Sequence, residues 1–195
     1  AAELGLNKVI SYDMGGTTAK ICLIEGQNAS KAREFEVDRQ ARFMKGSGLP
    51  LRIPVIEMVE IGAGGGSIAR VNSMSQITTG PDSAGANPGP AAYNRGGTQP
   101  TISDADVHLG RIDPKFFAGG HVKLDPALSA STIERNIAKP LKISSHMAAF
   151  GIAEIVDETM SNAARVHAVE RGYDARDHVI IAFGGAAPLH VGRIA

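Results

Sequence analysis

The sequence predicts a mixed α/β fold, and three observations support that prediction. Apolar runs of strand length meet adjacent glycines around residues 13–18, 62–67 and 183–188. Between residues 148 and 171, apolar side chains recur every three or four positions, as they do in an amphipathic helix. The length of 195 residues suits one domain, so we expect a single domain over residues 1–195.

The composition excludes several classes of protein. The chain has 20 Lys and Arg against 20 Asp and Glu, so it lacks the excess positive charge that nucleic-acid binding requires. No apolar run approaches the roughly 18 residues of a membrane span, and the first residues do not have the pattern of a signal peptide. A single cysteine, Cys22, forms no internal disulfide, which fits a reducing cytosol. We therefore expect a cytoplasmic protein that binds neither nucleic acid nor a membrane.

Strands joined by glycine turns are predicted for the first part of the chain. Residues 8–12 and 19–24 flank the turn at 13–18 and predict a β-hairpin. Residues 33–45 alternate weakly in polarity and predict another strand with a polar edge.

A second hairpin-like turn is predicted around residues 62–67. Residues 55–61 form an apolar run before these glycines, and residues 68–71 continue as an extended segment after them. Residues 79–97 are almost all Gly, Pro, Asn, Ser and Ala, which predicts a long functional or flexible loop.

The second half of the chain is more helical. Residues 101–104 supply capping side chains for a short helix over 105–109, and residues 126–139 predict a helix that stops before Pro140. A strong strand over 178–183 runs into a glycine turn and a new helix. The long helix at 148–171 is expected to bury a stripe made of Ile152, Ile155, Val156, Met160, Ala163, Val166 and Val169.

Both ends have the pattern of interrupted elements. The chain begins without Met at what resembles the end of a helix, and it ends in the first turns of another helix without a stop signal. We expect a fragment of a longer protein.

The glycine turns are suited to phosphate binding. Glycine lets the backbone turn with its N–H groups open, and successive open N–H groups bind anions. Thr17 and Thr18 add hydroxyl donors, and Asp13 can hold a hydrated Mg²⁺ beside the phosphates. No segment matches the P-loop pattern, and residues 62–66 lack the spacing of a dinucleotide-binding motif.

Six motifs together resemble the hydantoinase A/5-oxoprolinase family. They are DMGGTT (13–18), EIGAGGGSIA (60–69), GPDSAGANPGP (80–90), ISDAD with LGR (102–111), VERGYD (169–174) and AFGGAAPLH (182–190). The chain departs from the family pattern at Ala92, where Cys is frequent, and at Ala187, where Gly is commoner. The change at Ala92 leaves in doubt any covalent chemistry through a thiol in this loop.

The resemblance implies an incomplete lobe of the actin/sugar kinase/Hsp70-like (ribonuclease H-like) ATPase fold. It implies ATP and Mg²⁺ as cofactors, a cyclic amide such as a hydantoin or 5-oxoproline as substrate, and a second subunit or domain of the hydantoinase B type. It also implies that a first phosphate loop and a further carboxy-terminal stretch lie outside this chain, so the fragment alone is expected to be inactive. Asp13 is expected to be the catalytic and metal-binding residue. The expected cofactor-binding residues are Gly15, Gly16, Thr17, Thr18, Gly64, Gly65, Gly66, Ser67, Gly184, Gly185, Ala186, Pro188 and His190.

Other polar residues leave alternatives open. Asp104 either caps the helix at 105–109 or contributes to a metal or substrate site. Asp106 and His108 are expected to face solvent, with ligation of a metal or orientation of the substrate as the alternative, and His167 is expected to play a structural part on the long helix. His190 follows a glycine turn at the start of a helix, where it either contacts the ligand or packs.

Several functions are compatible with these motifs. The favoured one is the nucleotide-binding part of an ATP-dependent cyclic amide hydrolase. The alternatives are a subunit of an ATP-dependent ketone carboxylase, a small-molecule kinase of the same fold and a non-catalytic assembly subunit. The intact Asp-Met-Gly-Gly-Thr turn speaks against the last of these.

Overall fold

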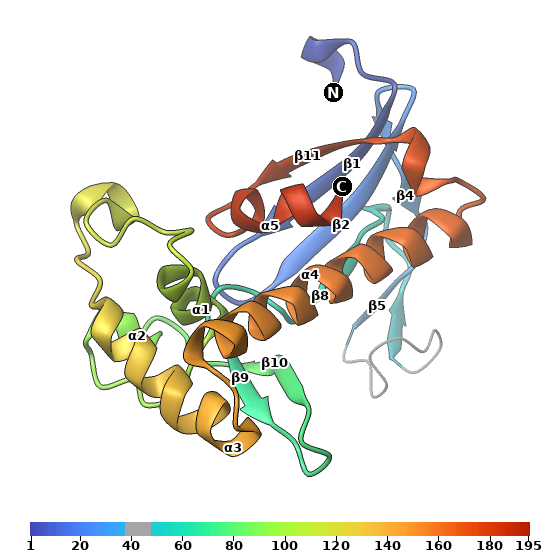
Figure 1. Ribbon diagram of the computed structural model, residues 1–195. Coiled ribbons are helices and arrows are strands. Elements are labelled where there is room, and N and C mark those ends of the chain that lie inside the picture. Colours follow the sequence, from blue (N-terminus) through green and yellow to red (C-terminus); the bar gives the residue numbers. More distant parts are fainter. Residues whose placement is uncertain (38–47) are drawn as a thin grey trace.

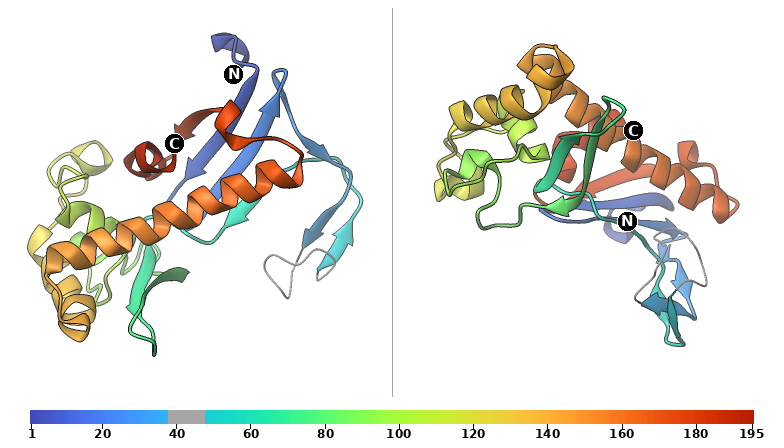
Figure 2. Two further views of the ribbon diagram at one scale, coloured as in Figure 1. Left: turned by 45° about the vertical axis from the view of Figure 1, so that its right-hand side comes forward. Right: turned by 90° about the horizontal axis from the view of Figure 1, so that it is seen from below.

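Figure 1 shows the computed structural model, which describes residues 1–37 and 48–195. A mixed β-sheet forms the centre, and two helices, α4 (Ser145–Glu170) and α5 (Ala187–Ile194), cover one of its faces (Figure 1 and Figure 2). A smaller group of short helices and a two-stranded sheet lies at one end of α4 (Figure 1). None of the helices in the described ranges combines the length and the apolar character that a membrane crossing needs.

The central sheet is built around β1 (Lys8–Met14). On one side β1 pairs in parallel with β11 (Val179–Phe183), and on the other it forms the predicted hairpin with the antiparallel β2 (Ala19–Glu25). Strand β2 also pairs antiparallel with β8 (Val59–Ile61) and with β3 (Asn28–Ala29).

In the described residues, three further strand pairs lie outside this sheet. They are β4 (Lys31–Ala32) with β7 (Val55–Ile56), β5 (Phe35–Val37) with β6 (Leu49–Leu51), and β9 (Ser67–Val71) with β10 (Ile77–Ser83). The remaining helices are α1 (Ile102–His108), α2 (Pro126–Ile133), α3 (Lys139–Leu141), the π-turn η4 (Glu134–Ala138), and the 3₁₀ turns η1 (Ala2–Leu4), η2 (Ala91–Tyr93), η3 (Phe117–Gly120) and η5 (Ala175–Asp177).

One face of the β1–β2 hairpin supplies the centre of the core. Alternate residues of both strands are buried, including Tyr12, Met14, Ile21 and Leu23. Because successive side chains of a strand point to opposite faces, this alternation places one face against the helices and leaves the other more open.

The long helix is confirmed, but its buried stripe differs from the prediction at one end. Ile152, Val156 and Met160 are fully buried, whereas Val166 and Val169 are 57% and 71% exposed. In the last turns the buried residues are instead Ala164, His167 and Ala168. Gly172 follows the helix with φ +77°, the left-handed conformation expected of a helix stop.

The second predicted hairpin is wrong. Strand β8 pairs with β2 and strand β9 pairs with β10, so the two segments around residues 62–66 never pair with each other. The apolar run at 55–61 is divided into β7 and β8. Long-range pairing to β2 thus prevails over the local pattern.

Three other predicted boundaries are corrected. The loop predicted over residues 79–97 contains the end of β10 and the turn η2. The helix predicted to stop before Pro140 is followed directly by the π-turn η4 and then by α3, so the helical stretch includes Pro140 and ends at Leu141. Of the strand predicted at 33–45, β5 is present, and residues 38–47 lie outside the described residues.

Candidate functional site

Three strands bring their carboxyl ends to one edge of the central sheet. Strand β11 runs parallel to β1, with Asp13 opposite Phe183. Strand β8 runs antiparallel to β2, with Ile61 opposite Ala19, and therefore points in the same direction as β1. Because each of these strands is followed by glycines, the three predicted glycine turns meet at this edge.

The turn at residues 15–18 is open. The amide of Gly15 donates to the Thr18 carbonyl at 3.1 Å, and Gly16 and Thr17 are exposed. Among the described residues, no hydrogen bond uses the amides of Gly16, Thr17 or Thr18. A Cβ added at Gly15 or Gly16 would meet nothing within 4 Å. Three free backbone donors and two hydroxyls are therefore available to an anion at this turn.

Residues 64–67 form a buried support for that turn. The Gly65 amide donates to the Gly15 carbonyl at 3.0 Å, and the Gly66 amide donates to the Gly16 carbonyl at 2.7 Å. A Cβ at Gly64 would lie 2.5 Å from the Thr17 nitrogen, so only glycine permits this approach of two backbones.

The expectation that residues 64–67 present open amides to a ligand is corrected. The Gly64 amide donates to the Ser67 hydroxyl at 2.9 Å, and the Ser67 amide donates to the Gly64 carbonyl at 2.8 Å. With the two bonds to the turn, all four amides of this segment are occupied, and all four residues are buried. Their part in the site is to hold the 15–18 turn in place.

The third turn packs against Asp13 from the other side. Gly184 has φ +90°, and a Cβ there would collide with the Asp13 carboxylate and lie 2.6 Å from the Met14 carbonyl oxygen. The Ala186 amide donates to the same Met14 carbonyl at 2.9 Å. Gly184, Gly185 and Pro188 are exposed, so this turn offers an accessible surface beside Asp13.

Asp13 lies at the centre of the edge. It is half-buried, and among the described residues no hydrogen bond or ion pair engages its carboxylate. No group of three or more His, Cys, Asp and Glu in the described ranges is arranged to hold a metal ion. A single free carboxylate beside free amides suits a hydrated Mg²⁺ better than a transition metal.

Asp104 has a structural role. Its carboxylate is fully buried and accepts bonds from the amides of Ala91, Ala92 and Thr101 and from the hydroxyls of Thr101 and Ser129, at 2.8 to 3.1 Å. Thr101 is the N-cap of α1, and Asp104 completes a capping box with it. This carboxylate joins the end of the long loop to α1 and α2, and has little capacity left for a metal.

His190 lies in a buried cluster of charges, and this corrects its expected contact with a nucleotide. Its side chain is fully buried, with Nδ1 2.6 Å from Asp157 Oδ1 and Nε2 3.3 Å from Asp106 Oδ2. Arg111 Nη1 lies 3.4 Å from Asp106 Oδ1 and 3.9 Å from Asp157 Oδ2. We refer to His190, Asp106, Asp157 and Arg111 as the His190 cluster.

This cluster was not expected from the sequence. Asp106 was expected to face solvent but is 1% exposed, and Asp157 was not singled out. The available signal was the position of Asp157 three residues before Met160 of the apolar stripe, a spacing that places both on one face of α4. A charge at a core position of a helix requires a buried partner.

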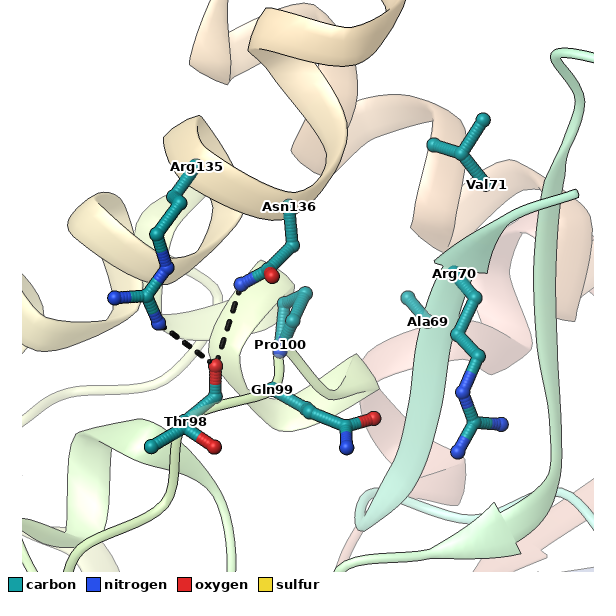
Figure 3. Close-up of a pocket in the computed structure, with 8 residues that line it drawn as sticks. All are labelled: Ala69, Arg70, Val71, Thr98, Gln99, Pro100, Arg135 and Asn136. Carbon is teal, nitrogen blue, oxygen red and sulfur yellow. Dashed lines mark hydrogen bonds between the residues drawn. The ribbon is translucent and has the colours of Figure 1, made fainter.

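A separate hollow of about 440 Å³ lies beside β9 and η4 (Figure 3). Arg135 and Asn136 line it and both donate to the Thr98 carbonyl, at 2.9 and 3.2 Å. None of residues 13–18 or 184–188 lines this hollow, so it is distinct from the strand-edge site.

Comparison with known proteins identifies relatives over the whole chain. A protein-family model described as hydantoinase/oxoprolinase matches residues 1–195. The chain is 41% identical to the caprolactamase subunit alpha of Pseudomonas jessenii, across 100% of this chain and 27% of that protein. It is 38% identical to the acetophenone carboxylase gamma subunit of Aromatoleum aromaticum, across 98% of this chain and 25% of that protein.

A solved structure agrees with these sequence relatives. The nucleotide-free structure of acetone carboxylase superposes with a TM-score of 0.87 at 32% identity, across 99% of this chain and 26% of that one. This match confirms the expected α/β lobe of the actin-like ATPase type, in which β11 joins the β1–β2 hairpin in parallel. The chain spans about a quarter of the length of each of these three relatives. From its match along all 195 residues, the chain belongs to the hydantoinase/oxoprolinase family.

Proposed function

We propose that this chain is the phosphate-binding part of an enzyme that couples ATP hydrolysis to opening of a cyclic amide. The single observation that carries the proposal is the 15–18 turn, where three amides and the nearby Asp13 carboxylate have no hydrogen-bond partner among the described residues. Phosphoryl transfer depends mainly on positioning and on stabilisation of charge, and free backbone donors supply both.

The residues present fit ATP with Mg²⁺. The amides of Gly16, Thr17 and Thr18 and the two threonine hydroxyls would hold phosphate oxygens, and Asp13 would hold the metal through water. Mg²⁺ would neutralise the negative charge of the phosphates. The exposed turn of Gly184, Gly185 and Pro188 would border the sugar or base.

The cyclic amide is proposed as substrate from the names of the relatives and of the family that this chain matches. The caprolactamase subunit alpha acts, by its name, on a lactam, and the family description names hydantoins and oxoproline. Relatives described as alpha and gamma subunits support a second subunit for the parent protein. We propose that residues 1–195 form one domain of that larger enzyme.

Replacement of Asp13 tests the proposal. In the full-length parent enzyme, Asp13→Asn removes the metal-binding charge and is expected to lower substrate-stimulated ATPase activity about 100-fold. Asp177→Asn is the control, because Asp177 pairs with Lys8 at the opposite end of the same sheet. Full ATPase activity of the Asp13 variant would remove the basis of the proposal.

A ketone carboxylase subunit is the second candidate function. The acetophenone carboxylase relative and the acetone carboxylase structure favour it. Assaying the parent enzyme with lactams, hydantoins and ketones, with and without bicarbonate, separates the two. ATP hydrolysis that depends on bicarbonate and a ketone would favour the carboxylase, and ring opening without bicarbonate the amide hydrolase. A stable phosphorylated product would instead identify a small-molecule kinase.

A further inference from the structure

The His190 cluster joins three helices behind the strand-edge site. Asp106 lies in α1, Asp157 near the middle of α4 and His190 in the first turn of α5. All three side chains are at least 97% buried. Buried charges are costly unless they are paired, so an arrangement of this kind constrains the helices that carry it.

The charges of the cluster balance only when His190 is protonated. Each ring nitrogen faces a carboxylate oxygen, at 2.6 Å for Asp157 and 3.3 Å for Asp106. A neutral imidazole has one N–H and one lone pair, so it would face one of these carboxylates with a lone pair. The imidazolium and the Arg111 guanidinium together offset the two negative charges.

The cluster is connected to the phosphate side through a short segment of chain. His190 is four residues after Ala186, whose amide is bonded to the Met14 carbonyl, and six after Gly184, which packs on Asp13. Helix α5 begins between them, at Ala187, without a side-chain cap. The orientation of α5 therefore determines where the 184–187 turn meets Asp13.

We propose that His190 is a positioning residue for the nucleotide site. Held between Asp106 and Asp157, it locks the first turn of α5 onto α1 and α4, and thereby holds the 184–187 turn against Asp13 and Met14. This inference rests on the proposed function, and it gives His190 an indirect role in place of contact with the nucleotide.

The groups around His190 determine its pKa, and with it the expected pH dependence of stability and of the KM for ATP. Burial lowers the pKa of His190, but the bonds and charges of Asp106 and Asp157 outweigh it and raise the pKa to about 9, above the ordinary 6.5. Tyr12, on β1, has a pKa raised above its usual range by burial and by the charge of Asp157, so it stays neutral. Arg111 stays charged. A second pair, Glu154 with Arg193, joins α4 and α5 at the surface, at 2.7 Å.

The direction of the effect follows from linkage. Because the pKa of His190 is higher in the folded state, its contribution to stability is full below about pH 6.5 and is lost as pH rises through about 9. The KM for ATP is therefore expected to rise, and the apparent Tm to fall, over this alkaline range.

Two substitutions in the full-length parent enzyme test the role. His190→Gln removes the positive charge and is expected to raise the KM for ATP about tenfold and to abolish its alkaline rise. Asp157→Asn removes one carboxylate that raises the pKa of His190, so the alkaline rise should move to lower pH. Arg193→Ala is the matched control, because it breaks the exposed contact between α4 and α5. It should change neither the KM for ATP nor the alkaline rise of that KM.

The possible outcomes separate the two proposals. Full ATPase activity of Asp13→Asn would overturn the proposed function, and with it the inference that depends on it. If Asp13→Asn is inactive while His190→Gln lowers only the Tm and leaves the KM and its pH profile unchanged, His190 is merely structural and the inference fails alone. Should His190→Gln not fold, an unshifted pH profile of Asp157→Asn would overturn the inference instead.

Discussion

Two glycine clusters of nearly the same composition have opposite roles in this molecule. At residues 15–18 the amides of Gly16, Thr17 and Thr18 have no hydrogen-bond partner in the part of the chain that the structure describes, and Gly16 and Thr17 are exposed. At residues 64–66 every amide is bonded and every residue is buried. The first cluster presents donors, and the second lets another backbone approach closely enough to hold the first in place.

The difference teaches that adjacent glycines behind a strand do not by themselves indicate a ligand site. Glycine has two uses, because the missing Cβ can leave space for a ligand or for another part of the chain. In the second cluster that space is occupied by the 15–18 turn itself, with Gly64 against Thr17.

The largest expected effect comes from adding one methyl group to each cluster. Gly64→Ala places a Cβ 2.5 Å from the Thr17 nitrogen and 2.8 Å from the Gly15 carbonyl oxygen, and should lower the free energy of unfolding by about 3 kcal/mol. The Cβ added by Gly16→Ala would meet nothing within 4 Å, so this change should alter the free energy of unfolding by less than about 0.5 kcal/mol. Thermal unfolding of the parent protein measures both. Equal losses of unfolding free energy in Gly64→Ala and Gly16→Ala would contradict the difference between the two clusters.

A smaller effect is expected at the third turn. Gly184→Ala adds a Cβ at φ +90° against the Asp13 carboxylate, and should cost about 1–3 kcal/mol and displace Asp13. The neighbouring Gly185→Ala meets nothing within 4 Å and is the control. The free energy of unfolding of the parent enzyme should fall in Gly184→Ala alone, and its ATPase activity should fall with it. A loss of stability in Gly185→Ala with normal stability of Gly184→Ala would contradict the close packing of Gly184 on Asp13.

The smallest expected effect compares two hydroxyls. Ser67→Ala leaves the buried Gly64 amide without its acceptor and should cost about 1 kcal/mol of stability. Thr17→Ala removes an exposed hydroxyl, so it should leave stability unchanged while raising the KM for ATP. Unfolding and ATPase measurements on both variants sharpen the comparison. A Thr17 variant that lost stability but kept its KM would contradict it.

Much of the local structure could be predicted from the sequence. The hairpin at 13–18, the strand β11, the helix α4 and its stop at Gly172 follow from short-range patterns of apolar residues and glycine. These patterns are reliable because hairpin turns and helical periodicity are set by residues close together in the chain. The convergence of Asp13 with the turn at 184–188 was expected from the family resemblance alone.

Long-range packing decided the rest. The pairing of β8 with β2, and not with β9, depends on a strand about 40 positions earlier in the chain, and it carries Gly64 against Thr17. Likewise Asp106, Asp157 and His190 come from three helices, and no local pattern shows that their charges will meet.

By itself, then, the sequence determined which turns could offer backbone donors, because a residue without a Cβ places no side chain of its own over its N–H. Only the tertiary structure decided which of those donors remain free. An N–H group bonds to the nearest available acceptor, and for residues 65 and 66 the acceptors are the carbonyls of Gly15 and Gly16, brought there by the sheet.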